Sequence, residues 1–235
     1  MTIRSFLVLG LSLMLGLAIF GFQIGRAVKS GREFDRYLSV KGLSEREVKA
    51  NLALWPIQFS VAAEDLGTLK QAMETSRALV LSFLQERGID SKEIAQGLPV
   101  VSDREDERIQ ANRPALARYR GVVTLVVRST NVDVVKKVIQ GSDALLAKGV
   151  TLAGDGSGNR IEFIFNAVND IKPDMIKEAT ANARTSAEKF AQDSQSKVGR
   201  IRKATQGVLE IEDRDAASPE WKALRVVTTV DFFLE

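Results

Sequence analysis

The strongest strand signal in the chain is YRGVVTLVVRS, residues 119–129. Its Val, Thr and Leu side chains favour the extended backbone of a β-strand. A helix is predicted directly after it, from about Val132 to Lys148, with Asn131 or Thr130 as the N-cap and Gly149 closing it. The middle of the chain therefore predicts a strand followed by a helix, and the flanking sequence predicts further strands in pairs.

Before this centre, the hydrophobic period switches between two and 3.6 residues, which predicts strands and then a helix. Strands are expected at Tyr37–Gly42 and Leu52–Ala62, and Pro56 places the second one at a sheet edge or a bulge. A helix follows from Leu66 to Gly88, because glycine commonly stands just after a helix end. An extended pair of strands is expected at about 94–104 and 116–129, joined by a highly charged loop, and the second strand contains the central motif.

The second half is predicted to hold a hairpin, a long helix and a closing pair of strands. The expected elements are strands 150–153 and 160–167, a helix from Pro173 to about Val198, and strands 201–212 and 223–234. The complete order is ββ-α-ββ-α-ββ-α-ββ, preceded by one N-terminal transmembrane helix. Helices that separate strand pairs predict an α+β fold, with helices laid on mixed or antiparallel sheets.

Several short motifs match one known family in their order along the chain. They are Ser39–Gly42, Leu69–Gly88, Gly121–Val127, Gly149–Val150, the alanine-rich segment Glu178–Lys189, and Val230–Phe232. Together these residues resemble the SIMPL-domain family of bacterial envelope proteins, of the periplasmic immunogenic protein type, over about residues 38–235. The resemblance implies a periplasmic α+β domain, ring assembly as in some members, and a link to envelope or oxidative stress. No enzymatic activity is established for that family, so the resemblance implies no active-site residues.

Residues 5–25 read SFLVLGLSLMLGLAIFGFQIG and carry no charge. As a helix this segment spans roughly 31 Å, about the hydrocarbon thickness of a bilayer. Two interpretations are open, a retained single-pass anchor and a cleaved signal peptide, and the length of the apolar run favours the anchor. The predicted organisation is an anchor or signal segment at 1–27, a juxtamembrane connector at 28–36, and an α+β domain at 37–235.

The orientation of this segment rests on two opposing observations. The basic residues Arg26, Lys29 and Arg32 outnumber Arg4, which by the positive-inside rule favours a cytoplasmic domain. A single N-terminal apolar run before a long polar remainder is instead the usual layout of an exported, anchored domain. We expect a bacterial inner-membrane protein with its large domain in the periplasm.

Small residues recur at helical spacing within the apolar segment. Ala18, Gly21 and Gly25 lie on one predicted helix face, and Gly21 to Gly25 matches the GxxxG pattern. Small residues of this kind let two membrane helices approach closely. The sequence therefore predicts a helix-packing face, although glycine is also common in such segments without that role.

The chain has no cysteine and no histidine. This composition excludes disulfides, thiol nucleophiles, histidine-based triads and most transition-metal sites. The 33 basic and 30 acidic residues leave a net charge of +3, and the whole excess lies within residues 1–31. The neutral remainder is poorly suited to binding a phosphate backbone. We expect no catalytic residue, no cofactor, no metal and no nucleic-acid partner.

Three local features could have a functional role, but each is better explained by structure. Asp103–Arg108 interleaves both signs of charge, which is typical of a solvated loop, with a cation or partner surface as the alternative. Gly154–Asn159 lacks the lysine and hydroxyl of a phosphate loop and the closing glutamate of a calcium loop, so it is predicted to be a hairpin tip. Trp55 and Trp221 are expected to pack at a strand edge and a turn rather than to stack on a ligand.

These observations predict a non-enzymatic, membrane-anchored envelope protein whose SIMPL-like domain self-associates into a ring or scaffold. Its neutral surface, with interleaved charges, suits homotypic packing. Two alternatives remain open. One is a monomeric periplasmic binding module for a small molecule or peptide, with a closed apolar pocket, and the other is a hydrolase using carboxylates or a Ser–Lys pair. The predicted partners are the lipid bilayer, through residues 5–25, and further copies of the chain.

Overall fold

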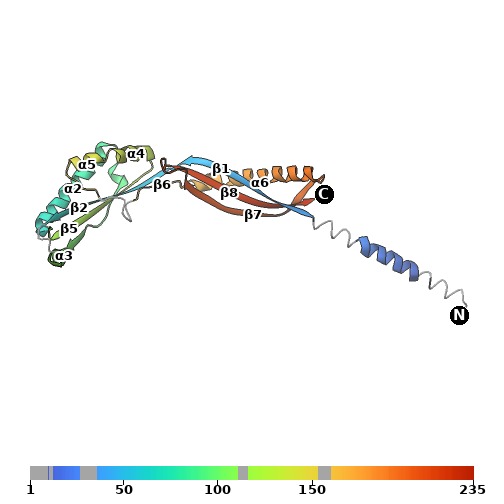
Figure 1. Ribbon diagram of the computed structural model, residues 1–235. Coiled ribbons are helices and arrows are strands. Elements are labelled where there is room, and N and C mark those ends of the chain that lie inside the picture. The colour runs from blue at the N-terminus through green and yellow to red at the C-terminus, as the bar shows by residue number, and fades with distance from the viewer. Residues whose placement is uncertain (1–9, 11–12, 27–35, 111–115, 153–159) are drawn as a thin grey trace. The chain divides into compact units, whose positions relative to one another are not determined.

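The computed structural model describes residues 10, 13–26, 36–110, 116–152 and 160–235 (Figure 1). The chain divides into two compact units, each assembled from segments far apart in the sequence. The first unit comprises residues 1–46, 171–210 and 225–235, and the second comprises 47–170 and 211–224. Helices pack with antiparallel sheets in this structure, so the predicted α+β class is confirmed.

The second unit is built on a five-stranded antiparallel sheet with β2 (Leu52–Ala63) and β5 (Tyr119–Ser129) at its centre. These two strands pair without interruption from Ala53↔Ser129 to Ala63↔Tyr119. Three short strands flank them, namely β3 (Ile94–Gln96) and β4 (Val100–Asp103) beside β5, and β6 (Glu162–Ile164) beside β2. The strand predicted at about 116–129 is therefore at the centre of this sheet, although it begins at Tyr119.

A large apolar core lies between this sheet and three of the described helices of the second unit. The helices are α2 (Leu66–Glu86), α4 (Val132–Gln140) and α5 (Asp143–Ala147), and a short 3-10 helix, η1 (Ser91–Glu93), follows α2. The core between helices and sheet includes Phe59, Phe83, Leu84, Leu125 and Leu145, all fully buried. Gly121 allows α2 to lie close to β5, because a Cβ atom at this position would lie 2.5 Å from the Met73 sulfur.

The first unit is built on three long antiparallel strands in the order β1 (Tyr37–Lys49), β8 (Trp221–Leu234) and β7 (Val198–Asp213). The Leu234 amide donates to the Arg36 carbonyl at 3.0 Å, so β8 ends where β1 begins. Lys197 and Glu235 exchange backbone hydrogen bonds of 2.8 and 2.9 Å, so β7 begins at this same end of the sheet. Figure 1 shows the three strands running side by side.

Helix α6 (Val168–Asp193) packs on one face of these strands through small side chains. Ala179, Ala183, Ala187 and Ala191 are buried along it. Gly42 on β1 makes this approach possible, since a Cβ atom there would lie 1.8 Å from the Ala179 carbonyl oxygen. The core of this unit is correspondingly small, with Val40, Val230 and Phe232 packed against Ala183 and Ala187.

The predicted elements around residues 94–148 were partly wrong. The strand expected at 94–104 is divided into β3 and β4 on either side of Pro99, which has no amide hydrogen to donate to a ladder. The charged segment after it forms α3 (Glu105–Gln110), whose first turn carries three acids, the sign of charge that a helix N-terminus favours. The helix expected at 132–148 is interrupted at Gly141, which caps α4.

The second half also differs from prediction. Leu152 makes only an isolated bridge, with Phe59, and β6 pairs with β2 rather than closing a hairpin. The predicted hairpin loop Gly154–Asn159 lies outside the described residues.

The long helix α6 begins before Pro173, so this proline stands inside the helix and not at its start. It ends at Asp193 because Gln195 adopts a positive φ of 55° and the Ser196 amide donates to the Ala191 carbonyl at 2.8 Å. No glycine marks this end in the sequence. Strand β1 in turn runs on past Gly42 to Lys49.

Candidate functional site

The three-stranded sheet has one face that α6 does not cover. On β8 the even-numbered residues such as Val226, Val230 and Phe232 are buried, and their odd-numbered neighbours are partly exposed or exposed. On β1 the same alternation buries Val40 and leaves Tyr37 48% exposed. We call the odd-numbered side of β1 and β8 the open face. Because successive side chains of a strand point to opposite faces, this side is turned to solvent along both strands.

Strand β7 forms the outer edge of this sheet, and all but three of its 16 residues are exposed. Exposed apolar side chains lie along it, with Val208 at 83%, Ile201 at 45% and Ile211 at 40%. An edge strand presents a row of backbone N–H and C=O groups that can pair with another strand. The length of β7 makes this row long.

The charges on β7 are divided by sign. Its first half carries Arg200, Arg202 and Lys203, and its last residues include Glu210 and Glu212. The Arg202 guanidinium lies 4.2 Å from the Tyr37 ring centroid, and that of Arg200 lies 5.6 Å from the ring of Phe233. Tyr37 and Phe233 both belong to the open face, so both arginines lie on that face.

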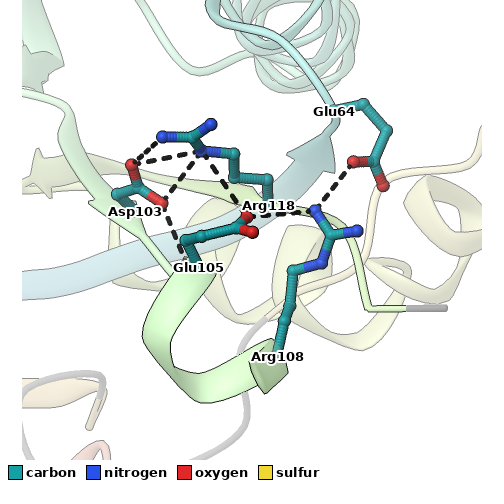
Figure 2. A network of polar contacts seen from close by, with 5 residues as sticks. All are labelled: Glu64, Asp103, Glu105, Arg108 and Arg118. Carbon is teal, nitrogen blue, oxygen red and sulfur yellow. Dashed lines mark hydrogen bonds and ion pairs between the residues drawn. The ribbon is translucent and has the colours of Figure 1, made fainter. Parts of the chain in front are cut away.

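A second charged cluster lies beside β4, α3 and β5 in the second unit (Figure 2). Arg118 binds Asp103 through two nitrogens, at 3.2 Å from Nε to Oδ1 and 2.9 Å from Nη2 to Oδ2. Arg108 bridges Glu105 at 3.4 Å and Glu64 at 3.2 Å. Asp103–Arg108 was predicted to be a solvated loop or a partner surface. Its charged side chains instead form ion pairs with one another and with Arg118 and Glu64.

This cluster shifts the pKa values of its strongest pair. The hydrogen bond from Arg118 lowers the pKa of Asp103, and the amide of Glu105 lowers it further. The same contact raises the pKa of Arg118. Both groups are therefore held in their charged forms, and their mutual pairing fits a role in fixing the end of β4 to the start of β5.

A buried ion pair joins α4 to the start of β8. Glu220 is 6% exposed, and one of its carboxylate oxygens accepts a hydrogen bond from Lys136, while the other has no partner among the described residues. Burial raises the pKa of Glu220, but the hydrogen bond from Lys136 and the charges of Lys136 and Lys49 outweigh burial and lower it. Lys49 itself binds Asp133 at 2.6 Å. These groups fasten β1, α4 and β8 within the second unit.

A cleft of about 640 Å³ lies in the second unit beside β6. Its lining mixes charged and apolar side chains, including Arg160, Glu162, Phe163, Pro219 and Lys222. Lys222 is paired with Asp213, which also lines the cleft. The cleft is open to solvent and not the closed apolar pocket expected of a small-molecule binding module.

The N-terminal segment is described in part. Residues 13–26 form a helix that carries Ala18, Gly21 and Gly25, and all three are exposed. A Cβ atom at Gly21 or Gly25 would meet no described atom within 4 Å. Among the described residues, no helix has both the length and the apolar character needed to cross a membrane. Apart from residue 10, the rest of the predicted span at 5–25 lies outside the described residues, so the helix-packing face stays a prediction.

The two tryptophans lie in different surroundings. Trp55 is 6% exposed in the core of the second unit, next to Pro56, which lies beyond the three residues of β2 that β6 covers. Trp221 is half-buried at the start of β8, where the Arg214 guanidinium lies 5.3 Å from its ring centroid. Trp55 thus packs in the core, and the proline beside it stands where, among the described residues, one side of the strand has no ladder partner.

The chain can now be compared with known protein families. A model of the SIMPL family, described as a protein of unknown function (DUF541), matches residues 38–228. The chain belongs to the SIMPL family. The match starts in β1 and ends in β8, so it includes residues of both units of this SIMPL protein. No curated protein matches the chain. The resemblance inferred from the sequence motifs is confirmed.

Sequence reasoning missed two features of this SIMPL protein. The edge position of β7 was not anticipated, although the blocks RIRK at 200–203 and EIED at 210–213 are visible in the sequence. The burial of Glu220 was also missed, and its neighbours Pro219 and Trp221 carry no signal for it. Among the described residues, no group of three or more acidic side chains is placed to hold a metal ion.

Proposed function

We propose that this SIMPL protein is a non-catalytic scaffold of the bacterial envelope. Residues 5–25 hold it at the inner membrane with the large domain in the periplasm, and the folded domain associates with further copies into a ring or another scaffold. The observation that carries the proposal is β7, an edge strand of 16 residues that is exposed along nearly all its length. The envelope or oxidative-stress setting comes from the family resemblance.

The chemistry of the edge supports self-association over steering of a charged ligand. Basic and acidic side chains occur on the same strand in similar number, so the strand as a whole attracts neither anions nor cations strongly. The exposed Val208 and Ile201 supply apolar area that a partner would bury. A second copy meets all of these requirements at once, because it presents the same strand.

The deciding experiment is the mass of the full-length protein, purified in detergent, beside a chain that begins at Phe34. Two large and uniform species support assembly through the folded domain. A large full-length protein with a monomeric shorter chain assigns the assembly to the N-terminal helix and its Ala18, Gly21 and Gly25 face. Two monomers at high concentration refute the scaffold.

A monomeric binding module is the second candidate, and the cleft beside β6 is the observation that favours it. Arg160 and Lys222 there suit an anionic small molecule or the carboxylate of a peptide, in balance with Glu162 and Asp213. A ligand that binds only the folded state raises the melting temperature with concentration. A thermal-shift screen with small carboxylates tests this candidate, and Arg160→Ala should abolish a shift that arises in the cleft.

A further inference from the structure

The pattern of charge along β7 is more specific than general self-association requires. Arg200 and Arg202 alternate with Ile201, and Glu210 and Glu212 alternate with Ile211. Both arginines and both glutamates are exposed, and no ion pair within the described chain engages them. The strand therefore carries two basic positions and two acidic positions with the same spacing.

These four charges lie on one side of the sheet. The contacts of Arg202 with Tyr37 and of Arg200 with Phe233 place the arginines on the open face. At the other end of β7, Asp213 is paired with Lys222, an even-numbered residue of β8 and thus on the opposite side from the open face. Glu212 and Glu210 stand one and three residues before Asp213, so alternation over these last residues of β7 places both on the open face with the arginines.

Symmetry restricts how two copies of β7 can meet. Two identical strands that pair edge to edge in antiparallel fashion are related by a two-fold axis perpendicular to the sheet, which keeps each side chain on its own face. Directly opposed residues also share a face. The axis must therefore lie midway between the two copies of one residue, so that this residue opposes itself across the interface. An axis at Gln206 sets Arg202 opposite Glu210 and Arg200 opposite Glu212. An axis at Thr205 or Gly207 opposes only one arginine to a glutamate.

We propose that β7 pairs with β7 of a second copy of this chain, antiparallel, about a two-fold axis at Gln206. The pairing rests on the proposed function and names one of its contact surfaces, since a two-fold contact closes as a dimer and a ring requires a second one. It joins the two three-stranded sheets into one six-stranded sheet, with both copies of α6 on one side and both open faces on the other. Four ion pairs form on the open faces, two from each copy, and Ile201 meets Ile211 on the side of α6.

The division of work within this interface follows from its chemistry. Backbone hydrogen bonds along the edge bring the strands together, as in other cases of strand addition. The ion pairs select the antiparallel register, because a shift by two residues loses one arginine–glutamate pair in each copy and a parallel arrangement opposes like charges. Since the four charges are exposed, the association weakens as ionic strength rises.

Charge reversal tests the register in the full-length protein. Arg202→Glu opposes two acids in each half of the interface and should weaken dimerisation at least tenfold, by analytical ultracentrifugation in detergent at low salt. Glu210→Arg should do the same. The double variant Arg202→Glu, Glu210→Arg restores opposite charges across the axis and should recover most of the wild-type affinity. Lys41→Glu is the matched control, since Lys41 is exposed on β1 at the far edge of the sheet.

The outcomes separate this proposal from the function on which it rests. A monomeric wild-type protein refutes the scaffold itself. A wild-type assembly that Arg202→Glu leaves unchanged, with the circular dichroism spectrum preserved, retains the scaffold and refutes the β7 pairing. Loss of assembly in both single variants without recovery in the double variant refutes the register at Gln206.

Cysteine cross-linking gives an independent measurement, because the natural chain has no cysteine. Gln206→Cys places two thiols across the axis within disulfide range and should yield a covalent dimer on mild oxidation. Ala204→Cys is the control: its two copies stand about 13 Å apart in this register, too far for a disulfide. Ala204→Cys mixed with Val208→Cys should form the mixed dimer only. Equal cross-linking of Ala204→Cys and Gln206→Cys would falsify the register.

Discussion

The two sheets of this protein end in opposite ways. In the second unit, the long strands β2 and β5 are flanked by β3, β4 and β6, which have only three or four residues each. In the other sheet, the outermost strand on one side is β7, with 16 residues. Short edge strands are one way in which natural proteins prevent unwanted strand pairing. The contrast indicates that one sheet is closed to further strands and that the other is built to accept one.

The apolar cores of the two units also differ, in the size of the side chains that they bury. The second unit buries large side chains such as Phe59, Phe83 and Leu125 between helices and sheet. The first unit buries alanines of α6 against Val40, Val230 and Phe232. Because burial of apolar area is the main source of stability, the first unit has less of its own and more to gain from a partner.

The largest expected effect comes from emptying the larger core. Phe83→Ala removes a fully buried ring and should lower the free energy of unfolding by about 3–5 kcal/mol. Both tryptophans, Trp55 and Trp221, belong to the second unit, so tryptophan fluorescence during urea unfolding reports on it. Phe190→Ala, at a ring that is 61% exposed, is the control and should change stability by less than about 0.5 kcal/mol. A similar loss in both variants would contradict the described core.

A smaller effect is expected where α6 meets β1. Gly42→Ala introduces a Cβ atom where the Ala179 carbonyl lies, and should cost about 1–3 kcal/mol as the helix is displaced. The part of the helical circular dichroism signal that α6 contributes should be lost at a lower urea concentration than the tryptophan signal, since α6 packs in the first unit and α2, α4 and α5 belong to the second. The neighbouring exposed variant Lys41→Ala should leave both transitions in place. Coincident shifts of both signals would show that the two units unfold together.

The smallest effect concerns the ion pairs of the second unit and their dependence on pH. Arg118 lowers the pKa of Asp103 below its ordinary 3.8, so the folded state favours the carboxylate. The stabilisation is present in full well above pH 3.8 and is lost as the pH falls below that value, through the lowered pKa of the folded state. Asp103→Asn should therefore be less stable than the wild type at neutral pH and equal to it in strong acid. Urea unfolding at a series of pH values measures the difference, and 1 M salt should reduce it.

The elements that sequence could predict are those whose reasons are local. Residues 119–129 form a strand because β-branched side chains dominate them, and α2 ends before Gly88 because a glycine there accepts the positive φ of 89°. The end of α6 was missed because Gln195, a residue with no special preference for that conformation, takes the same role. Local sequence therefore decides an element when the residue type and the backbone requirement agree.

The exposed edge strand β7 could not be predicted from the sequence, for a different reason. The charges of β7 are plain in the sequence, but their exposure depends on β7 lying outermost, and strand order is a property of the whole fold. The same holds for Glu220, which is buried and accepts a hydrogen bond from Lys136 of α4, a distant part of the chain. Pairings of this kind have no local signature.

The hydrogen bond from the Leu234 amide to the Arg36 carbonyl places the start of β1 beside the end of the chain, at the end of the sheet where β7 also begins. In the antiparallel dimer, the two β1 starts then lie at opposite ends of the six-stranded sheet, on the order of 60 Å apart. Residues 26–36, at full extension, reach no further than about 40 Å. If residues 5–25 anchor both copies in one bilayer, as we propose, the dimer must lie with its strands along the membrane plane.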